Sequence, residues 1–119
     1  MSNLHICFIF RIDQVGTSIP VDVEETYEKS VKKLIALLYS NPRIYATFSF
    51  SGTMLEWYEK KHPEVLDVLK ELSSRKQVEI LGGGFYDPLF PLLLPVDRLG
   101  QIELLQIGLR RTLGKRPRG

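Results

Sequence analysis

A run of glycines followed by two aromatic residues and an acid is the stretch of this sequence best suited to chemistry. Gly82, Gly83 and Gly84 come directly before Phe85-Tyr86-Asp87-Pro88. Glycine lacks a Cβ and readily adopts positive φ, so this run lets the backbone turn and approach a ligand closely. A tight turn from a strand into a loop explains the same run. The sequence therefore predicts either a simple turn or a ligand-binding loop.

A second set of polar residues follows the apolar N-terminal stretch and includes Asp13 and Gln14. Carboxylates from two loops, Asp13 and Asp87, could serve as an acid and a base or hold sugar hydroxyls. Tyr86 beside Phe85 would offer a stacking face. Asp13 is also explained as a turn or solvated residue, and Asp87 as an Asp-Pro turn. The predicted substrate-binding residues are Asp87, Tyr86, Gln14 and Asp13, and no catalytic residue is assigned.

Several other chemistries have no pattern here. His5 lies in an apolar run and His62 beside a helix start, and no His or Cys has metal-ligand spacing. Cys7 is interpreted as a small buried hydrophobic residue. The glycines match neither a dinucleotide fingerprint nor a phosphate loop, and there is no nucleophile elbow. We expect no metal and no cofactor.

Strands and helices alternate along the chain. Leu4 to Phe10 is almost continuously apolar and predicts a strand buried on both faces. The other predicted strands cover residues 44–50 and 77–81. Helices are predicted from Asp22, capped with Glu25, to about Tyr39; from Thr53 to Tyr58 and again from Pro63 to Leu72; and after Pro95.

This order predicts an α/β fold of three β/α units with parallel strands. An open doubly wound sheet and a section of a β/α barrel both fit the order. In either case, ligands bind at the carboxyl ends of the strands. Loops 11–20, 51–53 and 82–95 should therefore share one rim. We expect residues 1–119 to form a single partial domain.

Composition narrows the class of protein. The 119 residues carry 16 Lys+Arg and 14 Asp+Glu, for a net charge of +2, so nucleic-acid binding is not expected. No apolar run is long enough to span a membrane, and the single cysteine fits a reducing cytoplasm. We expect a cytoplasmic protein that binds neither nucleic acid nor membrane.

One family resembles the central motif. The run Gly83-Gly84-Phe85-Tyr86-Asp87-Pro88, with residues 79–81 before it and residues 95–98 and Gln101 after it, is similar to the second motif of glycoside hydrolase family 57. Residues 48–57 resemble that family's second strand and following helix. The resemblance implies a seven-fold β/α barrel, retaining chemistry on α-glucans or maltooligosaccharides, and no metal or organic cofactor.

The resemblance also suggests roles for single residues. Asp87 matches an acidic position that lines the sugar cleft, and Tyr86 its aromatic neighbour. The first-strand motif, His-x-His-Gln-Pro, falls on Arg11-Ile12-Asp13-Gln14 and Val15, so both histidines and the proline are replaced. The family's catalytic glutamate and aspartate would fall beyond Gly119.

From this resemblance we expect the N-terminal segment of an α-glucan-acting retaining glycosidase or 4-α-glucanotransferase. It would supply substrate-cleft residues and be inactive alone. A non-catalytic carbohydrate-binding or interaction module, or a remnant without activity, is the alternative. The third predicted strand would have an open edge, which predicts self-association.

Overall fold

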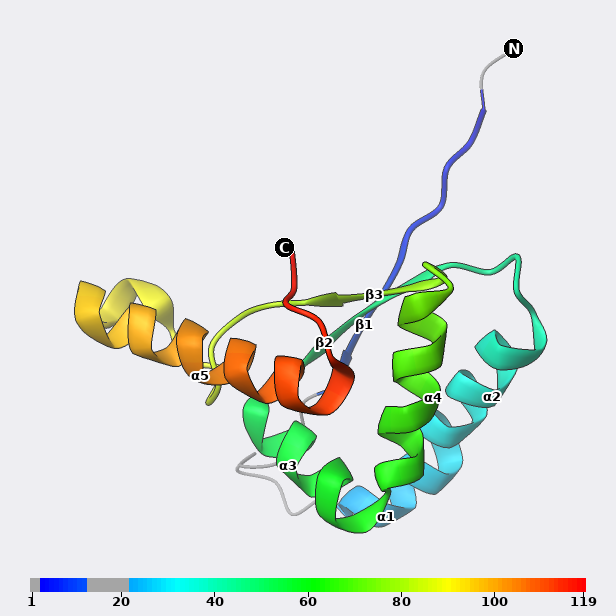
Figure 1. Cartoon of the computed structure of the whole chain (residues 1–119), viewed down its shortest axis with the longest axis horizontal. Coiled ribbons are helices and arrows are strands. Elements are labelled where there is room, and N and C mark those ends of the chain that lie inside the picture. The colour runs from blue at the N-terminus through cyan, green and yellow to red at the C-terminus, as the bar shows by residue number, and fades with distance from the viewer. Residues whose placement is uncertain (1–2, 13–21) are drawn as a thin grey trace.

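The core of the structure is a sheet of three parallel strands. A computed structural model describes residues 3–12 and 22–119 (Figure 1). The strands are β1 (Phe8–Ile12), β2 (Ala46–Phe50) and β3 (Val78–Leu81), in the order β1-β2-β3. β1 begins opposite Ala46 of β2, and β2 pairs from Ala46 to Ser49 with β3. The predicted α/β fold with parallel strands is confirmed.

Helices follow each strand. They are α1 (Val23–Thr26), the π-helix η1 (Tyr27–Val31), α2 (Lys32–Ser40), α3 (Gly52–Lys61), α4 (Pro63–Ser74), the 3₁₀-helix η2 (Phe90–Leu92) and α5 (Pro95–Leu113). The side chain of Asp22 caps α1 and that of Ser51 caps α3, each accepting from a backbone N–H three residues on. Gly114, at φ 76°, ends α5.

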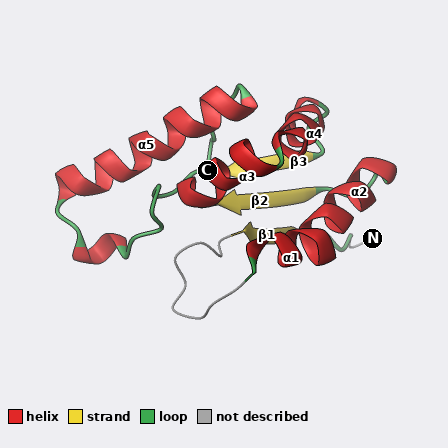
Figure 2. Cartoon of the chain, turned by 90° about the horizontal axis from the view of Figure 1, so that it is seen from below, coloured by secondary structure: helices red, strands yellow, loops and turns green. Residues whose placement is uncertain are grey.

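The helices gather on one side of the sheet, as Figures 1 and 2 show. Alternate residues of the central strand are buried: Ala46, Phe48 and Phe50. Against them pack fully buried side chains of the helices, among them Tyr58, Leu69 and Leu105. The last helix, predicted after Pro95, buries one face in this core, because Leu105, Leu109 and Leu113 are at most 3% exposed.

The first strand differs from its prediction. It begins at Phe8 rather than Leu4, and Leu4 and Ile6 are 86% and 65% exposed. Within residues 3–12 and 22–119, β1 pairs with β2 alone. It is therefore an edge strand, and the prediction of burial on both faces is wrong. Cys7 is exposed for the same reason, so its interpretation as a buried residue is also wrong.

Gln77, just before β3, fixes the turn between α2 and β2. Its side chain is buried, and its Nε2 lies 2.6, 3.1 and 2.9 Å from the carbonyl oxygens of Leu38, Asn41 and Ile44. A buried amide that satisfies several backbone carbonyls fixes a turn that has no ladder partners of its own.

No helix in the described ranges has the length and apolarity needed to cross a membrane.

Candidate functional site

The carboxyl ends of the three strands meet at one edge of the sheet, which we call the rim: Arg11, Gly52 and Phe85–Asp87. The side chains of Arg11, on β1, and Asp87, after β3, form an ion pair. The N–H of Gly52, the first residue of α3, donates to the carbonyl of Phe85 at 2.6 Å. Segments far apart in the sequence are thus joined where ligands of α/β folds bind.

Gln101, on α5, fixes the backbone of the rim at Phe85 and Tyr86. Its backbone carbonyl accepts from the N–H of Phe85 at 3.1 Å, and its side-chain oxygen accepts from the N–H of Tyr86 at 2.9 Å. The Phe85 ring packs where a side chain at position 52 would lie, since a Cβ there would be 2.1 Å from its Cδ2. Gly52 is therefore needed for close approach, and the loop is fixed mainly by its backbone.

The glycine run acts differently from its prediction. None of Gly82, Gly83 and Gly84 has a positive φ; instead Asp87 does, at 52°. A Cβ at Gly84 would lie 2.4 Å from Cδ of Pro88, so this glycine allows the loop to fold back on itself. Aspartate tolerates the left-handed region better than most residues. The turn therefore depends on close contact at Gly84 and on left-handed backbone at Asp87.

The two aromatic residues of the rim have different environments. Tyr86 is 63% exposed, whereas Phe85 is partly buried against the core. Their ring centroids are 4.8 Å apart at an interplanar angle of 71°, an edge-to-face contact. Phe85 thus supports the Tyr86 ring from the protein side. Of these two rings, that of Tyr86 is the more exposed to solvent.

The remaining predicted rim residues are of two kinds. Asp13 and Gln14 lie outside the described residues. Ser51 is 5% exposed, and its hydroxyl accepts from the N–H of Met54 at 3.3 Å and contacts Thr53 at 3.1 Å. Its role is therefore helix capping. On the helix that follows, Tyr58 is part of the core and Trp57 packs against it.

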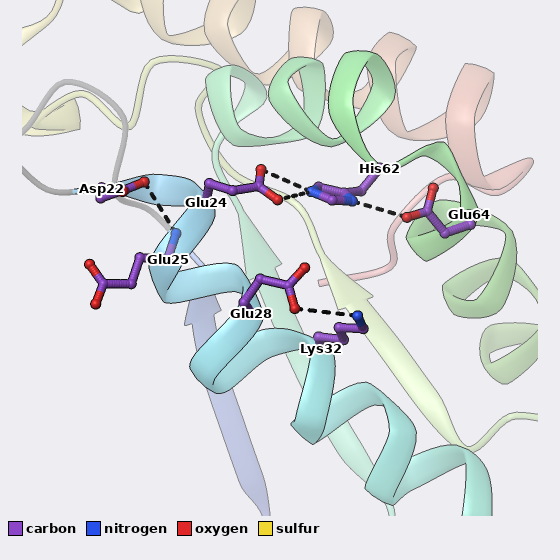
Figure 3. A network of polar contacts seen from close by, with 7 residues as sticks. All are labelled: Asp22, Glu24, Glu25, Glu28, Lys32, His62 and Glu64. Atoms are coloured by element: carbon purple, nitrogen blue, oxygen red, sulfur yellow. Dashed lines mark hydrogen bonds and ion pairs between the residues drawn. The ribbon is translucent and has the colours of Figure 1, made fainter.

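A second polar cluster, not predicted from the sequence, surrounds His62 at the junction of α3 and α4 (Figure 3). Its Nε2 lies 2.7 Å from Glu24 on α1, and its Nδ1 lies 3.0 Å from Glu64 on α4. The imidazole stacks on Tyr27, with centroids 3.9 Å apart, and lies 5.4 Å from the Trp57 ring. We call Glu24, Tyr27, Trp57, His62 and Glu64 the histidine cluster.

Charge and burial shift several pKa values in and around this cluster. The backbone N–H of Glu64 and the side chain of His62 lower the pKa of the Glu64 carboxyl. Burial, followed by the charge of Glu64, raises the pKa of Tyr27. Burial also raises the pKa of Tyr58, whose hydroxyl is neutral at physiological pH and has no hydrogen-bond partner in the described part of the chain. The described residues contain no group of His, Cys, Asp and Glu arranged to hold a metal ion.

Comparisons with known proteins agree on one family. The family model of glycosyl hydrolase family 57 matches residues 5–119. The chain is 37% identical over 97 residues to α-amylase 1 of Dictyoglomus thermophilum, a match that covers 82% of this chain and 14% of that protein. It is 40% identical over 83 residues to the 4-α-glucanotransferase of Thermococcus litoralis, covering 70% of this chain and 13% of that protein.

The fold agrees with the same relatives. The crystal structure of the Thermococcus litoralis 4-α-glucanotransferase superposes with a TM-score of 0.82 at 34% identity. The match covers 95% of this chain and 18% of that one. The chain therefore spans only a small part of the length of the relatives that it matches.

Proposed function

The chain belongs to glycosyl hydrolase family 57, and on that basis we propose that it forms one wall of a cleft that binds α-glucans. The observation that carries the proposal is the meeting of Arg11, Gly52 and Phe85–Asp87 at the carboxyl edge of the sheet. Asp87 would accept hydrogen bonds from sugar hydroxyls, and the exposed Tyr86 ring would stack on a pyranose. Asp13 and Gln14, which come directly after β1 in the sequence, are proposed to extend the same wall.

We further propose that the sheet is a section of a β/α barrel. The strands follow one another in sequence order, and the helices lie on one side of the sheet. Right-handed crossovers produce this arrangement in a barrel, whereas a doubly wound sheet reverses direction and carries helices on both faces. The N–H of Gly82 donates to the carbonyl of Gly119 at 2.6 Å, so the chain returns to the edge of β3 after α5.

Asp87 is proposed to hold substrate rather than to cleave it. A retaining glycosidase needs two carboxyl groups about 5–5.5 Å apart, one as nucleophile and one as acid and base. The rim partner of Asp87 is Arg11, whose guanidinium stays protonated and can perform neither role. The 119 residues would therefore bind an α-glucan within a glycosidase or glucanotransferase and lack turnover alone.

Calorimetric titration with maltoheptaose tests this function. We expect Asp87→Asn to weaken binding by roughly tenfold or more, because a hydrogen bond to a charged group contributes about 1.5–3 kcal/mol. Asparagine also tolerates left-handed backbone, so this variant keeps the turn. Absence of heat with any maltooligosaccharide would refute the binding function. Turnover by the 119 residues that disappears in Asp87→Ala would refute the assignment of Asp87 to binding alone.

A non-catalytic binding module is the second candidate function. It is favoured by Arg11, which stands where the family pattern has its first histidine and neutralises Asp87. Arg11→His separates the two candidates, since it restores the family residue. If binding strengthens, the rim is an impaired glycosidase cleft. If binding is lost, Arg11 itself contributes to a different kind of sugar site.

A further inference from the structure

His62 lies between two carboxylates that engage both of its ring nitrogens (Figure 3). Nε2 is 2.7 Å from Glu24 and Nδ1 is 3.0 Å from Glu64. Ionised carboxylates only accept hydrogen bonds, and a neutral imidazole has a single N–H to donate. Both contacts can be hydrogen bonds only when His62 is an imidazolium. In the neutral form, one ring nitrogen would direct its lone pair at a carboxylate.

The contact between His62 and Glu24 joins elements that are not consecutive along the chain. His62 ends α3 and precedes α4, Glu64 lies in the first turn of α4, and Glu24 belongs to α1. Tyr27, which stacks on the imidazole, is the first residue of the π-helix η1. The position at which α1 packs is thus linked to the protonation of one side chain.

Besides Glu24 and Glu64, described residues of α3, η1 and α2 surround His62. α3 contributes Trp57, which does not titrate, and Tyr58, whose hydroxyl is buried. η1 contributes Tyr27, which is also buried. Glu28 of η1 and Lys32 of α2 are paired with each other at 3.3 Å, and the charge of Lys32 also helps to lower the pKa of the Glu64 carboxyl. In the described part of the chain, Glu24 and Glu64 are the carboxylates in hydrogen-bond contact with the His62 ring.

We propose that His62 is a pH-sensitive clamp. As an imidazolium it fastens α1 to the junction of α3 and α4. Loss of its proton removes one of the two hydrogen bonds and loosens α1.

The direction of the pH effect follows from the balance at His62. Desolvation lowers the pKa of His62, but its hydrogen bonds to Glu64 and Glu24 outweigh that effect, so the pKa lies above its usual value of 6.5. A group whose pKa is raised in the folded state stabilises it fully below the unfolded value. That stabilisation is lost as the pH rises through the folded value. Each unit by which the pKa of His62 is raised corresponds to about a tenfold larger preference of the imidazolium for the folded state.

NMR of the imidazole nitrogens in the 119-residue chain tests the charge state. The chain has two histidines, so His5→Gln leaves the signals of His62 alone. We expect both ring nitrogens to be protonated at pH 6 and the titration midpoint to lie above 6.5. A single protonated nitrogen at pH 6, or a midpoint at or below 6.5, would overturn the proposal.

Two variants at neighbouring positions test whether Glu24 is the partner of the His62 imidazolium. Glu24→Gln removes the charge that faces Nε2, whereas Glu25→Gln removes a charge that pairs with Lys29 instead. We expect the midpoint of His62 to fall in Glu24→Gln and to stay in place in Glu25→Gln. Equal midpoints in the two variants would show that Glu24 does not hold the imidazolium.

Hydrogen exchange tests the release of α1. The amides of Thr26 and Tyr27 donate to carbonyls at the start of α1. Above the midpoint, we expect their protection factors to fall several-fold relative to that of Leu69, deep in α4. Protection factors already correct for the faster intrinsic exchange at higher pH. Unchanged protection at Thr26 and Tyr27 across the titration would refute the release.

Discussion

The rim and the histidine cluster both join distant parts of the chain, but by different means. The rim is held by backbone hydrogen bonds, by close approach at Gly52 and Gly84, and by one ion pair whose side chains are 60% and 44% exposed. The histidine cluster is held by side chains around an imidazole that is only 16% exposed. Water therefore screens the Arg11–Asp87 ion pair more than it screens the contacts of the His62 imidazole. The shape of the rim should therefore depend on backbone sterics, and the cluster on charge.

The largest effect should come from adding a Cβ at Gly84, directly before the rim residues Phe85–Asp87. In Gly84→Ala the new atom would lie 2.4 Å from Cδ of Pro88, so the loop must shift. We expect a loss of about 1–3 kcal/mol in the free energy of unfolding, the usual cost of overpacking. Urea denaturation followed by circular dichroism measures it.

Gly83→Ala is the matched control. A Cβ at position 83 would meet only Cδ2 of Leu105, at 3.9 Å, which is ordinary contact. We expect a change within about 0.5 kcal/mol. If both alanine variants unfolded at the same urea concentration, the rim would not depend on close approach at Gly84.

The next effect should come from the histidine cluster. His62→Gln keeps an amide NH2 group as a donor but loses the charge and the ring that stacks on Tyr27. At pH 6 we expect a loss of about 1–2 kcal/mol, since two charge-assisted hydrogen bonds and a ring contact are weakened while the carboxylates stay partly solvated. Thermal melts at pH 6 and pH 9 measure it, with His5→Gln as control.

The destabilisation caused by His62→Gln should depend on pH. Because wild-type His62 loses its proton at high pH, the difference between wild type and His62→Gln should narrow at pH 9. The same difference at both pH values would mean that the ring contributes packing alone. The histidine cluster would then resemble the rim in depending on shape rather than charge.

The sequence predicted local features better than distant contacts. The cap at Asp22 and the start of the last helix after Pro95 follow from neighbouring residues, and the structure has both. The cap at Ser51 was not predicted, because Ser51 was predicted to be part of the loop that ends the second strand. Glu24 and His62 are 38 residues apart, and no local pattern links them. The position of Asp87, after the third strand and its glycines, predicted a candidate binding residue. Its pairing with Arg11 depends on strand order, which the sequence left open between two architectures.

The prediction that the first strand is buried on both faces was wrong because burial also depends on neighbouring elements. The apolar run from Leu4 indicates residues that prefer burial, but Leu4 and Ile6 can be buried only if another element packs beside β1. The described residues supply only β2 as a neighbour. Composition can specify that a strand suits a buried position; it does not supply the partner that buries it.

The smallest effect should come from the rim's ion pair. Arg11→Met keeps much of the length of the side chain and removes its charge. Because both partners are exposed, we expect a loss of at most about 1 kcal/mol in stability, and less at high salt. Urea denaturation at low and high sodium chloride measures both. A loss larger than that of Gly84→Ala, or one that salt leaves unchanged, would mean that charge rather than backbone sterics sets the geometry of the rim.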